Sequence, residues 1–219
     1  VALETMSLGV YCLTGFRRGS PRSTEAAVKY FLLGSFAAAL TVYGGALLYG
    51  ATGRTDLAGI KAGVAALAEN AAAPAASGKL ALVIVGTVLM LAGLAFKISA
   101  VPFHFWTPDV YDGSPTVITS FMATVVKIAG FFSFVRLFEN AFGAVHAEWQ
   151  VLIVIMIAAT LFIGNITAVF QQSVKRMLAY SSIAQAGFML IALLALNNMA
   201  REGLILYSAG YCIATIGIF

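Results

Sequence analysis

The sequence is poor in charged residues. Of its 219 residues, 61% are hydrophobic and only 10% are charged, whereas soluble domains carry about a quarter charged residues. Three stretches contain no charge at all, and they lie between Lys29 and Arg54, between Glu148 and Lys175, and between Arg176 and Arg201. Each is long enough for a helix to cross a bilayer core, which takes roughly 20 residues. The composition excludes a water-soluble globular protein and predicts an integral membrane protein.

Cysteine and histidine are scarce as well. The two cysteines, Cys12 and Cys212, both lie in apolar runs, where a free cysteine acts as a small hydrophobe. They do not form a disulfide framework, and no spacing typical of a metal site is present. Nucleotide, flavin and iron–sulfur motifs are also missing. We therefore expect this chain to hold no metal and no cofactor.

The net charge of +4 does not indicate a nucleic-acid partner. The basic residues concentrate in short connections between apolar runs, as at Arg17, Arg18, Arg22 and Lys29. In membrane proteins such clusters set the orientation, because basic loops stay in the cytoplasm. The expected surroundings are a lipid bilayer, with no nucleic acid.

Seven apolar segments predict an all-α, polytopic transmembrane helix bundle. They cover residues 2–16, 28–50, 80–103, 115–137, 149–171, 174–196 and 203–219. A closed β-barrel is the other structure that spans lipid, but its strands alternate polar and apolar residues. Residues 151–157 are apolar on every side, which favours helices.

The residues outside these segments indicate no soluble domain. We expect residues 1–219 to form a single transmembrane domain, and to be part of a longer protein because the chain starts without methionine and stops inside an apolar run. The Ala/Gly-rich connection at 51–79 carries Leu57, Ile60, Val64 and Leu67 at helical spacing. We expect this connection to lie outside the membrane or along its surface.

The loops also predict an orientation. The connection from Arg17 to Lys29 and the Lys175-Arg176 pair are the most basic, so both are expected to face the cytoplasm. An even number of predicted helices separates them, which makes the two assignments consistent. The turn that carries Asp109 and Asp112 falls on the same side.

Lys97 lies deep in the third apolar segment, five residues before Pro102. A proline inside a helix removes a hydrogen bond, here the one to the carbonyl of Ile98. We therefore expect the helix to break near Lys97–Pro102, and broken helices at membrane depth line wet cavities or are buried in protein. The alternative is a lysine that extends to the membrane interface from a helix end.

Lys127 lies about twelve residues, or ~18 Å, into the fourth segment, which opens at the helix-start signal Ser114-Pro115. That position is close to the middle of the membrane. Its sequence neighbours are apolar, so its partner must come from another helix or from water. An ionisable residue at this depth is a candidate for function.

Two further titratable residues are candidates. Glu4 lies among apolar residues of the first segment and could be the counter-ion of a buried lysine, or could lie at the interface. His104 follows the expected break and could pass protons, or could be a hydrogen-bonded structural residue.

A set of uncharged polar residues in the fifth and sixth segments favours helix–helix contacts. Its members are Asn165, Thr167, Tyr180, Ser181, Ser182 and Gln185.

Three stretches of sequence resemble one known family. Residues 96–116 read FKISAVPFHFWTPDVYDGSPT, residues 123–127 read ATVVK, and residues 175–184 read KRMLAYSSIA. These stretches, together with EAAVKYFLLG at 25–34, are similar to the antiporter-like membrane subunits of respiratory NADH:quinone oxidoreductase (complex I). WTPDVY and ATVVK resemble the N-type, the bacterial counterpart of mitochondrial subunit two. The resemblance covers essentially the whole chain.

This resemblance implies roles for the three candidate charges. Glu4 matches the acidic partner on the family's fifth helix, Lys97 the lysine of the broken seventh helix, and Lys127 the central lysine of the eighth. Gln185 stands where a histidine is common in the family, so we assign no proton transfer to it. The implied function is proton translocation by a membrane subunit of the enzyme, without a redox site in this chain. Redox chemistry in partner subunits would drive it, in the bacterial inner (plasma) membrane.

Two other functions are weighed against this one. An Mrp-type sodium/proton antiporter subunit shares the broken helix and the buried lysines. A structural membrane scaffold would not explain two lysines in the bilayer, because each costs at least about 2.5 kcal/mol on insertion scales. The sequence favours the proton-translocating subunit, with Glu4, Lys97, Lys127 and His104 as its candidate site residues.

Overall fold

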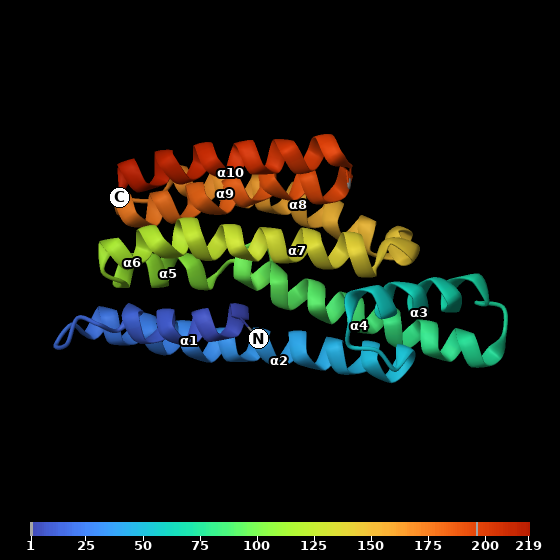
Figure 1. Cartoon of the computed structure of the whole chain (residues 1–219). Helices are drawn as coiled ribbons and strands as arrows, with labels where there is room; N and C mark the ends of the chain where they lie inside the picture. The colour runs from blue at the N-terminus through green and yellow to red at the C-terminus, as the bar shows by residue number, and fades with distance from the viewer. Residues whose placement is uncertain (1, 196) are drawn as a thin grey trace.

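The computed structural model describes residues 2–195 and 197–219, and these residues are helical except for short connections. The α-helices and two short helices of other types (η) are α1 (Ala2–Thr14), α2 (Pro21–Thr52), α3 (Leu57–Glu69), α4 (Pro74–Ile98), α5 (Trp106–Gly113), α6 (Thr116–Phe121), η1 (Met122–Val126), α7 (Lys127–Ala141), η2 (Gly143–Val145), α8 (His146–Val169), α9 (Val174–Ala195) and α10 (Asn198–Ile218). Figure 1 shows the long helices side by side in one bundle.

Five continuous helical stretches within the described residues are long and apolar enough to cross a membrane: Pro21–Thr52, Pro74–Ile98, Thr116–Ala141, Gly143–Val169 and Val174–Ala195. They correspond to the predicted segments at 28–50, 80–103, 115–137, 149–171 and 174–196, although Leu196 lies outside the described residues. The first and last predicted segments correspond to α1 and α10. The prediction of an all-α polytopic bundle is confirmed.

Two helix starts were predicted too late. Helix α2 begins at Pro21 rather than near residue 28, after the N-cap Ser20, whose hydroxyl accepts a hydrogen bond from the backbone N–H of Ser23. Helix α4 begins at Pro74 rather than near residue 80. Proline at the first turn of a helix needs no N–H partner. A serine cap followed by proline marks the start of α2, and proline alone, without a side-chain cap, marks that of α4.

Small residues bring the backbones of α2 and α4 together. A Cβ atom added to Gly44 would lie 2.6 Å from the carbonyl oxygen of Gly86, so no larger residue fits there. Close approach at small residues is the usual way in which helices associate in lipid, where the solvent is as apolar as the side chains. This contact fixes α4, and therefore Lys97, against α2.

The third apolar segment breaks where the sequence predicts it. Helix α4 ends at Ile98, and Ser99 follows in the left-handed conformation with φ of 64°. Two hydrogen bonds secure the corner: the indole N–H of Trp106 donates to the carbonyl of Phe96 (3.1 Å), and the backbone N–H of Val101 donates to the hydroxyl of Thr160 (3.0 Å). The break near Lys97–Pro102 is therefore confirmed, and α5 continues beyond it as a half-helix.

Lys127 follows a second irregularity that the sequence does not signal. Residues Met122–Val126 form a π-helical turn between α6 and α7. Such turns are rare in proteins, and those that occur are often found at functional sites. The wider turn sets the direction in which the following residue, Lys127, leaves the helix.

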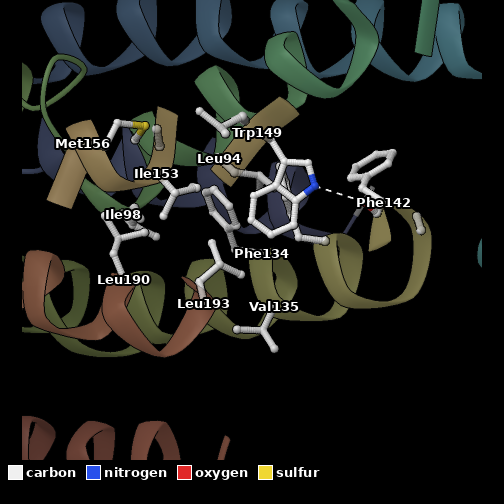
Figure 2. Close-up of a cluster of buried hydrophobic side chains, with 14 of the residues drawn as sticks. Leu94, Ile98, Phe134, Val135, Phe142, Trp149, Ile153, Met156, Leu190 and Leu193 are labelled. Carbon is white, nitrogen blue, oxygen red and sulfur yellow. Dashed lines mark hydrogen bonds between the residues drawn. The ribbon is translucent and has the colours of Figure 1, made fainter. Parts of the chain in front are cut away.

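The central core lies between α4, α7, α8 and α9. Figure 2 shows Leu94 and Ile98 of α4 meeting Phe134 of α7 and Trp149 of α8, with Leu190 of α9 beside them. The indole N–H of Trp149 is satisfied by the carbonyl of Phe142 at 3.0 Å. Dry packing thus fills one half of the bundle, and the polar residues described below gather elsewhere.

The connection at 51–79 contains helix α3. Ile60 and Val64 are buried, and α3 lies against α2, α4 and α7 at one end of the bundle (Figure 1). The interfacial position of this connection, and the single domain over 1–219, stay predictions.

Candidate functional site

Lys97 lies in the last turn of α4, only 5% exposed, and meets one face of α1. Its Nζ is 3.1 Å from Oε1 of Glu4 and 2.6 Å from the hydroxyl of Ser7, and it lies 5.9 Å from the centre of the Tyr11 ring. Residues three or four positions apart share a helix face, which is why Glu4, Ser7 and Tyr11 reach the same ammonium group. The structure therefore brings Glu4 and Lys97 together as an ion pair.

The two members of this pair differ in exposure. The side chain of Lys97 is 4% exposed, whereas that of Glu4 is 36% exposed. A buried charge without its partner is strongly unfavourable, so the carboxylate and the hydroxyl of Ser7 stabilise the ammonium group at this depth. Glu4 is therefore the less buried member of the pair in this chain.

Lys127 is 1% exposed and has only neutral partners. Its Nζ donates to the carbonyl of Ser182 at 2.8 Å and to the hydroxyl of the same residue at 2.6 Å. Within residues 2–195 and 197–219 no carboxylate forms an ion pair with it. An ammonium group has three hydrogens to donate, and two of them are used. The third calls for a water molecule.

The two lysines lie on helices that touch. A Cβ atom added to Gly130, which follows Lys127 by three residues on α7, would lie 3.1 Å from Ile98 and 3.7 Å from the Cβ of Lys97. Residues three apart share a helix face. The crossing of α4 and α7 therefore brings the backbones near the two lysines together, whereas the ammonium group of Lys97 faces α1 and that of Lys127 faces α9.

Several buried polar atoms around the break have no hydrogen-bond partner among the described residues. They are Nδ1 of His104 and the hydroxyls of Tyr11, Ser99, Thr107 and Tyr111. Buried polar groups are nearly always satisfied, if not by protein then by ordered water. Three of the five, those of Ser99, His104 and Thr107, belong to the connection between α4 and α5 or to the start of α5, so we expect water there. His104 is one of these residues. Among the described residues, no hydrogen bond or ion pair joins its side chain to Lys97 or Lys127.

Aromatic rings form the wall of this region. Tyr11 meets Tyr30 edge to face at 4.6 Å between ring centres, Tyr30 stacks on Trp106 at 4.5 Å, and Trp106 meets Tyr111 at 6.1 Å. Such pairs are rigid and add about 0.5–1.5 kcal/mol each beyond their buried area. The ring of Tyr11 at one end lies 5.9 Å from Nζ of Lys97, while its hydroxyl lies against Gly34 of α2, and Tyr111 at the other end belongs to α5.

A cluster of charges ties α5 to its neighbours. Asp109 accepts hydrogen bonds from Lys29 of α2 at 2.9 Å and from Arg176 of α9 at 2.7 Å. Burial by itself raises the pKa of Asp109, but the hydrogen bonds from Lys29 and Arg176 outweigh it and hold the pKa below its ordinary value. Together with Arg22, Glu25 and Asp112, these residues line a cavity of about 250 Å³.

This cluster also joins both basic connections to the Asp109–Asp112 turn. The Nζ of Lys175 donates to the carbonyl of Ser114, and the hydroxyl of Ser173 donates to Asp112. The three connections therefore lie at one end of the bundle, as the sequence indicates. Their assignment to the cytoplasm stays a prediction.

Sequence analysis did not identify all the partners of the lysines. Ser7 carried no assignment, although it follows Glu4 by three residues, and Ser182 was attributed only to helix contacts. The side-chain amide of Asn165 donates to the carbonyl of Leu161, which is a contact within α8 and not one between helices. No three Cys, His, Asp or Glu side chains of the described ranges are arranged to hold a metal ion. The expected lack of a cofactor stays a prediction.

Residues 1–219 match the family described as "NADH:quinone oxidoreductase/Mrp antiporter, TM". NADH-quinone oxidoreductase subunit N 1 of Sorangium cellulosum is 53% identical to the chain over 227 residues, which cover 100% of this chain and 44% of that relative. The chain thus spans less than half the length of the curated relatives that it matches.

Two solved structures are similar in fold. A chain of respiratory complex I from Thermus thermophilus has 41% identity and a TM-score of 0.76, over 98% of this chain and 44% of that one. A chain of the Mrp complex from Dietzia sp. DQ12-45-1b has 24% identity and a TM-score of 0.81, over 97% of this chain and 38% of that one. The second likeness concerns the fold alone.

These matches agree with the apolar helices in describing an integral membrane protein with several spans. They also confirm the resemblance to N-type subunits that the sequence showed. The chain belongs to the NADH:quinone oxidoreductase/Mrp antiporter family of transmembrane proteins.

Proposed function

We propose that the intact subunit translocates protons across the bacterial inner membrane as part of an NADH:quinone oxidoreductase. Glu4 modulates Lys97, and Lys97 exchanges protons with Lys127 through water and polar side chains. Redox chemistry in partner subunits supplies the energy, and this chain holds no redox site. The names of the relatives support the complex and the other membrane subunits as partners.

The observation that carries this proposal is the surroundings of Lys127. A mid-helix lysine that is 1% exposed and bound only by a serine carbonyl and a serine hydroxyl contributes nothing to stability that an apolar residue would not. Placing a charge there is costly, and ionisable residues inside membranes mark ion and proton pathways. A role in proton transfer explains why a lysine occupies this position.

The path between the lysines is supported by the wet corner of the chain. The close crossing of α4 and α7 at Gly130 supports a short path between the helices that carry the two lysines. The hydroxyls of Ser99 and Thr107 and Nδ1 of His104, all near the break, have no hydrogen-bond partner among the described residues, and buried polar groups of this kind are usually satisfied by water. Water in hydrogen-bonded contact with hydroxyls carries protons without moving heavy atoms. His104 is proposed as a member of this hydrated path.

Glu4 has the position of a regulator. Its carboxylate pairs with Lys97 at 3.1 Å yet is more than one third exposed. While the pair is closed, the charge on Lys97 is stabilised by its counter-ion. When the carboxylate moves away, the buried ammonium loses that stabilisation and gives its proton to water more readily. A change in a neighbouring subunit at this edge could thus control the first step.

The alternative is an Mrp-type sodium/proton antiporter subunit. The family description covers both kinds of protein, and the likeness to the Mrp complex is one of fold. The two functions differ in what drives transport. Proton movement that follows NADH oxidation and does not need sodium favours the first. Sodium–proton exchange without NADH favours the second.

The test is Lys127→Ala in the full subunit, assembled in the intact complex and reconstituted in liposomes. We expect the number of protons moved per electron to fall, because the central proton carrier is gone. Lys79→Ala is the matched control, since Lys79 lies on a helix of the same bundle but is exposed near its start. An unchanged ratio in Lys127→Ala, in fully assembled complex, would reject the relay.

A further inference from the structure

A second branch of polar contacts leaves Lys127, away from Lys97. The hydroxyl of Ser182 lies 2.6 Å from the Nζ of Lys127 and 2.8 Å from the hydroxyl of Tyr211. Ser182 is 3% exposed. One serine hydroxyl therefore joins a lysine on α7 to a tyrosine on α10, and neither serine nor tyrosine has a part in the relay proposed above.

This branch opens into a cleft between α9 and α10. The cleft measures about 100 Å³, and its polar lining consists of Ser181, Ser182, Gln185, Tyr211 and Thr215. A cavity needs about 10–15 Å³ of space to hold one water, so the cleft is large enough for water. Leu178 and Phe219 also line it, so it extends toward the end of the bundle that carries Lys175 and Arg176.

We propose that Ser182 and Tyr211 form a hydroxyl relay through which Lys127 exchanges protons with water in the α9–α10 cleft. This inference rests on the proposed function, which makes Lys127 a proton carrier. It adds a second connection to Lys127, on the opposite side from the one to Lys97. A carrier needs two such connections, one to receive the proton and one to release it.

The transfer balances at each oxygen. An N–H bond of the Lys127 ammonium breaks as an O–H bond forms on Ser182, and Ser182 passes its original hydrogen to the oxygen of Tyr211. Tyr211 then passes its own hydrogen to a water in the cleft, which becomes hydronium. Lys127 is left neutral, both hydroxyls are intact with their hydrogen bonds reversed, and no electron is transferred. Uptake follows the same steps in the opposite direction.

The chemistry of the residues favours this order. A hydroxyl both donates and accepts, so Ser182 can accept from Lys127 while it donates to Tyr211. The nearby tyrosine on the same helix, Tyr207, instead donates to the side-chain oxygen of Gln185, and among the hydrogen bonds of the described residues none joins it to Ser182. Of these two tyrosines, only Tyr211 continues the hydrogen-bonded path from Lys127.

Tyr211→Phe tests the relay, because it removes one oxygen and leaves the ring. In the full subunit within the intact complex in liposomes, we expect NADH-driven proton translocation to slow by roughly tenfold or more, the size of effect that a lost proton-transfer group has. Tyr207→Phe is the matched control, with the same substitution one helical turn away, and it should pump like the parent. The amount of assembled complex is measured for each variant.

A second pair of variants guards against a packing effect at Tyr211. Ser182→Ala keeps the backbone carbonyl that binds Lys127 but removes the hydroxyl, whereas Ser182→Thr keeps a hydroxyl. We expect the alanine variant to pump slowly and the threonine variant to recover most of the rate. If these hydroxyls only hold helices together, the substitutions should lower the amount of assembled complex and leave the pumping rate per assembled complex unchanged.

The outcomes separate the two proposals. Slow pumping in Tyr211→Phe and Ser182→Ala, with normal pumping in Tyr207→Phe, supports the hydroxyl relay. Normal pumping in both hydroxyl-deficient variants while Lys127→Ala fails overturns the relay and leaves the proposed function standing. Normal pumping in all of these variants, Lys127→Ala included, overturns the proposed function and this inference together.

Discussion

The surroundings of the two buried lysines differ in kind. Lys97 lies at the end of a broken helix and is paired with the carboxylate of Glu4, whereas Lys127 follows a π-helical turn and, among the described residues, donates hydrogen bonds to the two oxygens of Ser182. A counter-ion holds a charge in place, but neutral oxygens can accept a proton and pass it on. In the relay proposed above, this difference makes Lys97 the lysine that Glu4 modulates and Lys127 the lysine that exchanges protons with neutral groups.

The largest effect on proton translocation is expected from substitutions of Lys97 and of its counter-ion, Glu4. Lys97→Ala should reduce proton translocation per electron to a small fraction of the parent, and Glu4→Gln should reduce it less, because an amide still accepts a hydrogen bond from Nζ. In the double variant, Glu4→Gln should add nothing. The measurement is the proton-to-electron ratio of each single and double variant in liposomes. Additive losses would show that Glu4 acts independently of Lys97.

A large effect is also expected at the contact between the helices that carry the lysines. Gly130→Leu places a side chain where even a Cβ would lie 3.1 Å from Ile98. Overpacking of this kind costs about 1–3 kcal/mol, and it would move α7 and Lys127 away from Lys97. Thermal unfolding of the detergent-solubilised complex measures the loss. Gly143→Leu is the control, because a Cβ at Gly143 meets nothing within 4 Å.

A moderate effect is expected at the corner below Lys97. Trp106→Phe keeps an aromatic ring beside Tyr30 but removes the indole N–H that donates to the carbonyl of Phe96. Losing one buried hydrogen bond costs about 1 kcal/mol. We expect a lower unfolding temperature and faster amide hydrogen exchange at the end of α4. Unchanged exchange there would show that the corner does not depend on Trp106.

The smallest effect is expected at Asp109, which joins α5 to Lys29 and Arg176. Its folded-state pKa lies below the ordinary value of 3.8, so its contribution to stability is fully present above that value and is lost as the pH falls through the lower folded-state pKa. Because the side chain is 37% exposed, solvent limits this contribution to about 0.5 kcal/mol. Asp109→Asn should lower stability slightly at neutral pH and flatten its decrease in acid, as measured by thermal unfolding from pH 6 to about pH 3.

The sequence predicts those features whose causes are local. Pro102 has no N–H, so the break after Lys97 follows from one residue, and the lysines are conspicuous because their neighbours are apolar. The resemblance of residues 96–116 to a known family then relates these features to function. Charge in an apolar run and a proline near it were enough to predict the broken helix.

Features that depend on distant contacts could not be predicted in this way. Nothing in residues 122–126 signals a π-helical turn, because the packing of α7 against its neighbours decides it. The hydrogen bond between Lys127 and Ser182 joins residues 55 positions apart in sequence. Polar residues on one face of a membrane helix usually only bind neighbouring helices, so there was no reason in the sequence to connect Ser182 with the lysine. The early start of α2 at Pro21 was readable from Ser20 and Pro21, but the limits of the apolar run suggested a later one.

The corner after Lys97 has a consequence for how any pumping cycle must operate. Trp106 links the two half-helices across the gap, and Thr160 of α8 holds the loop between them. These two hydrogen bonds stabilise the main chain of the corner, so we expect it to move less than the surrounding side chains in the proposed cycle. Structures captured in different stages of the cycle should superimpose at residues 96–106 and differ in side chains and solvent.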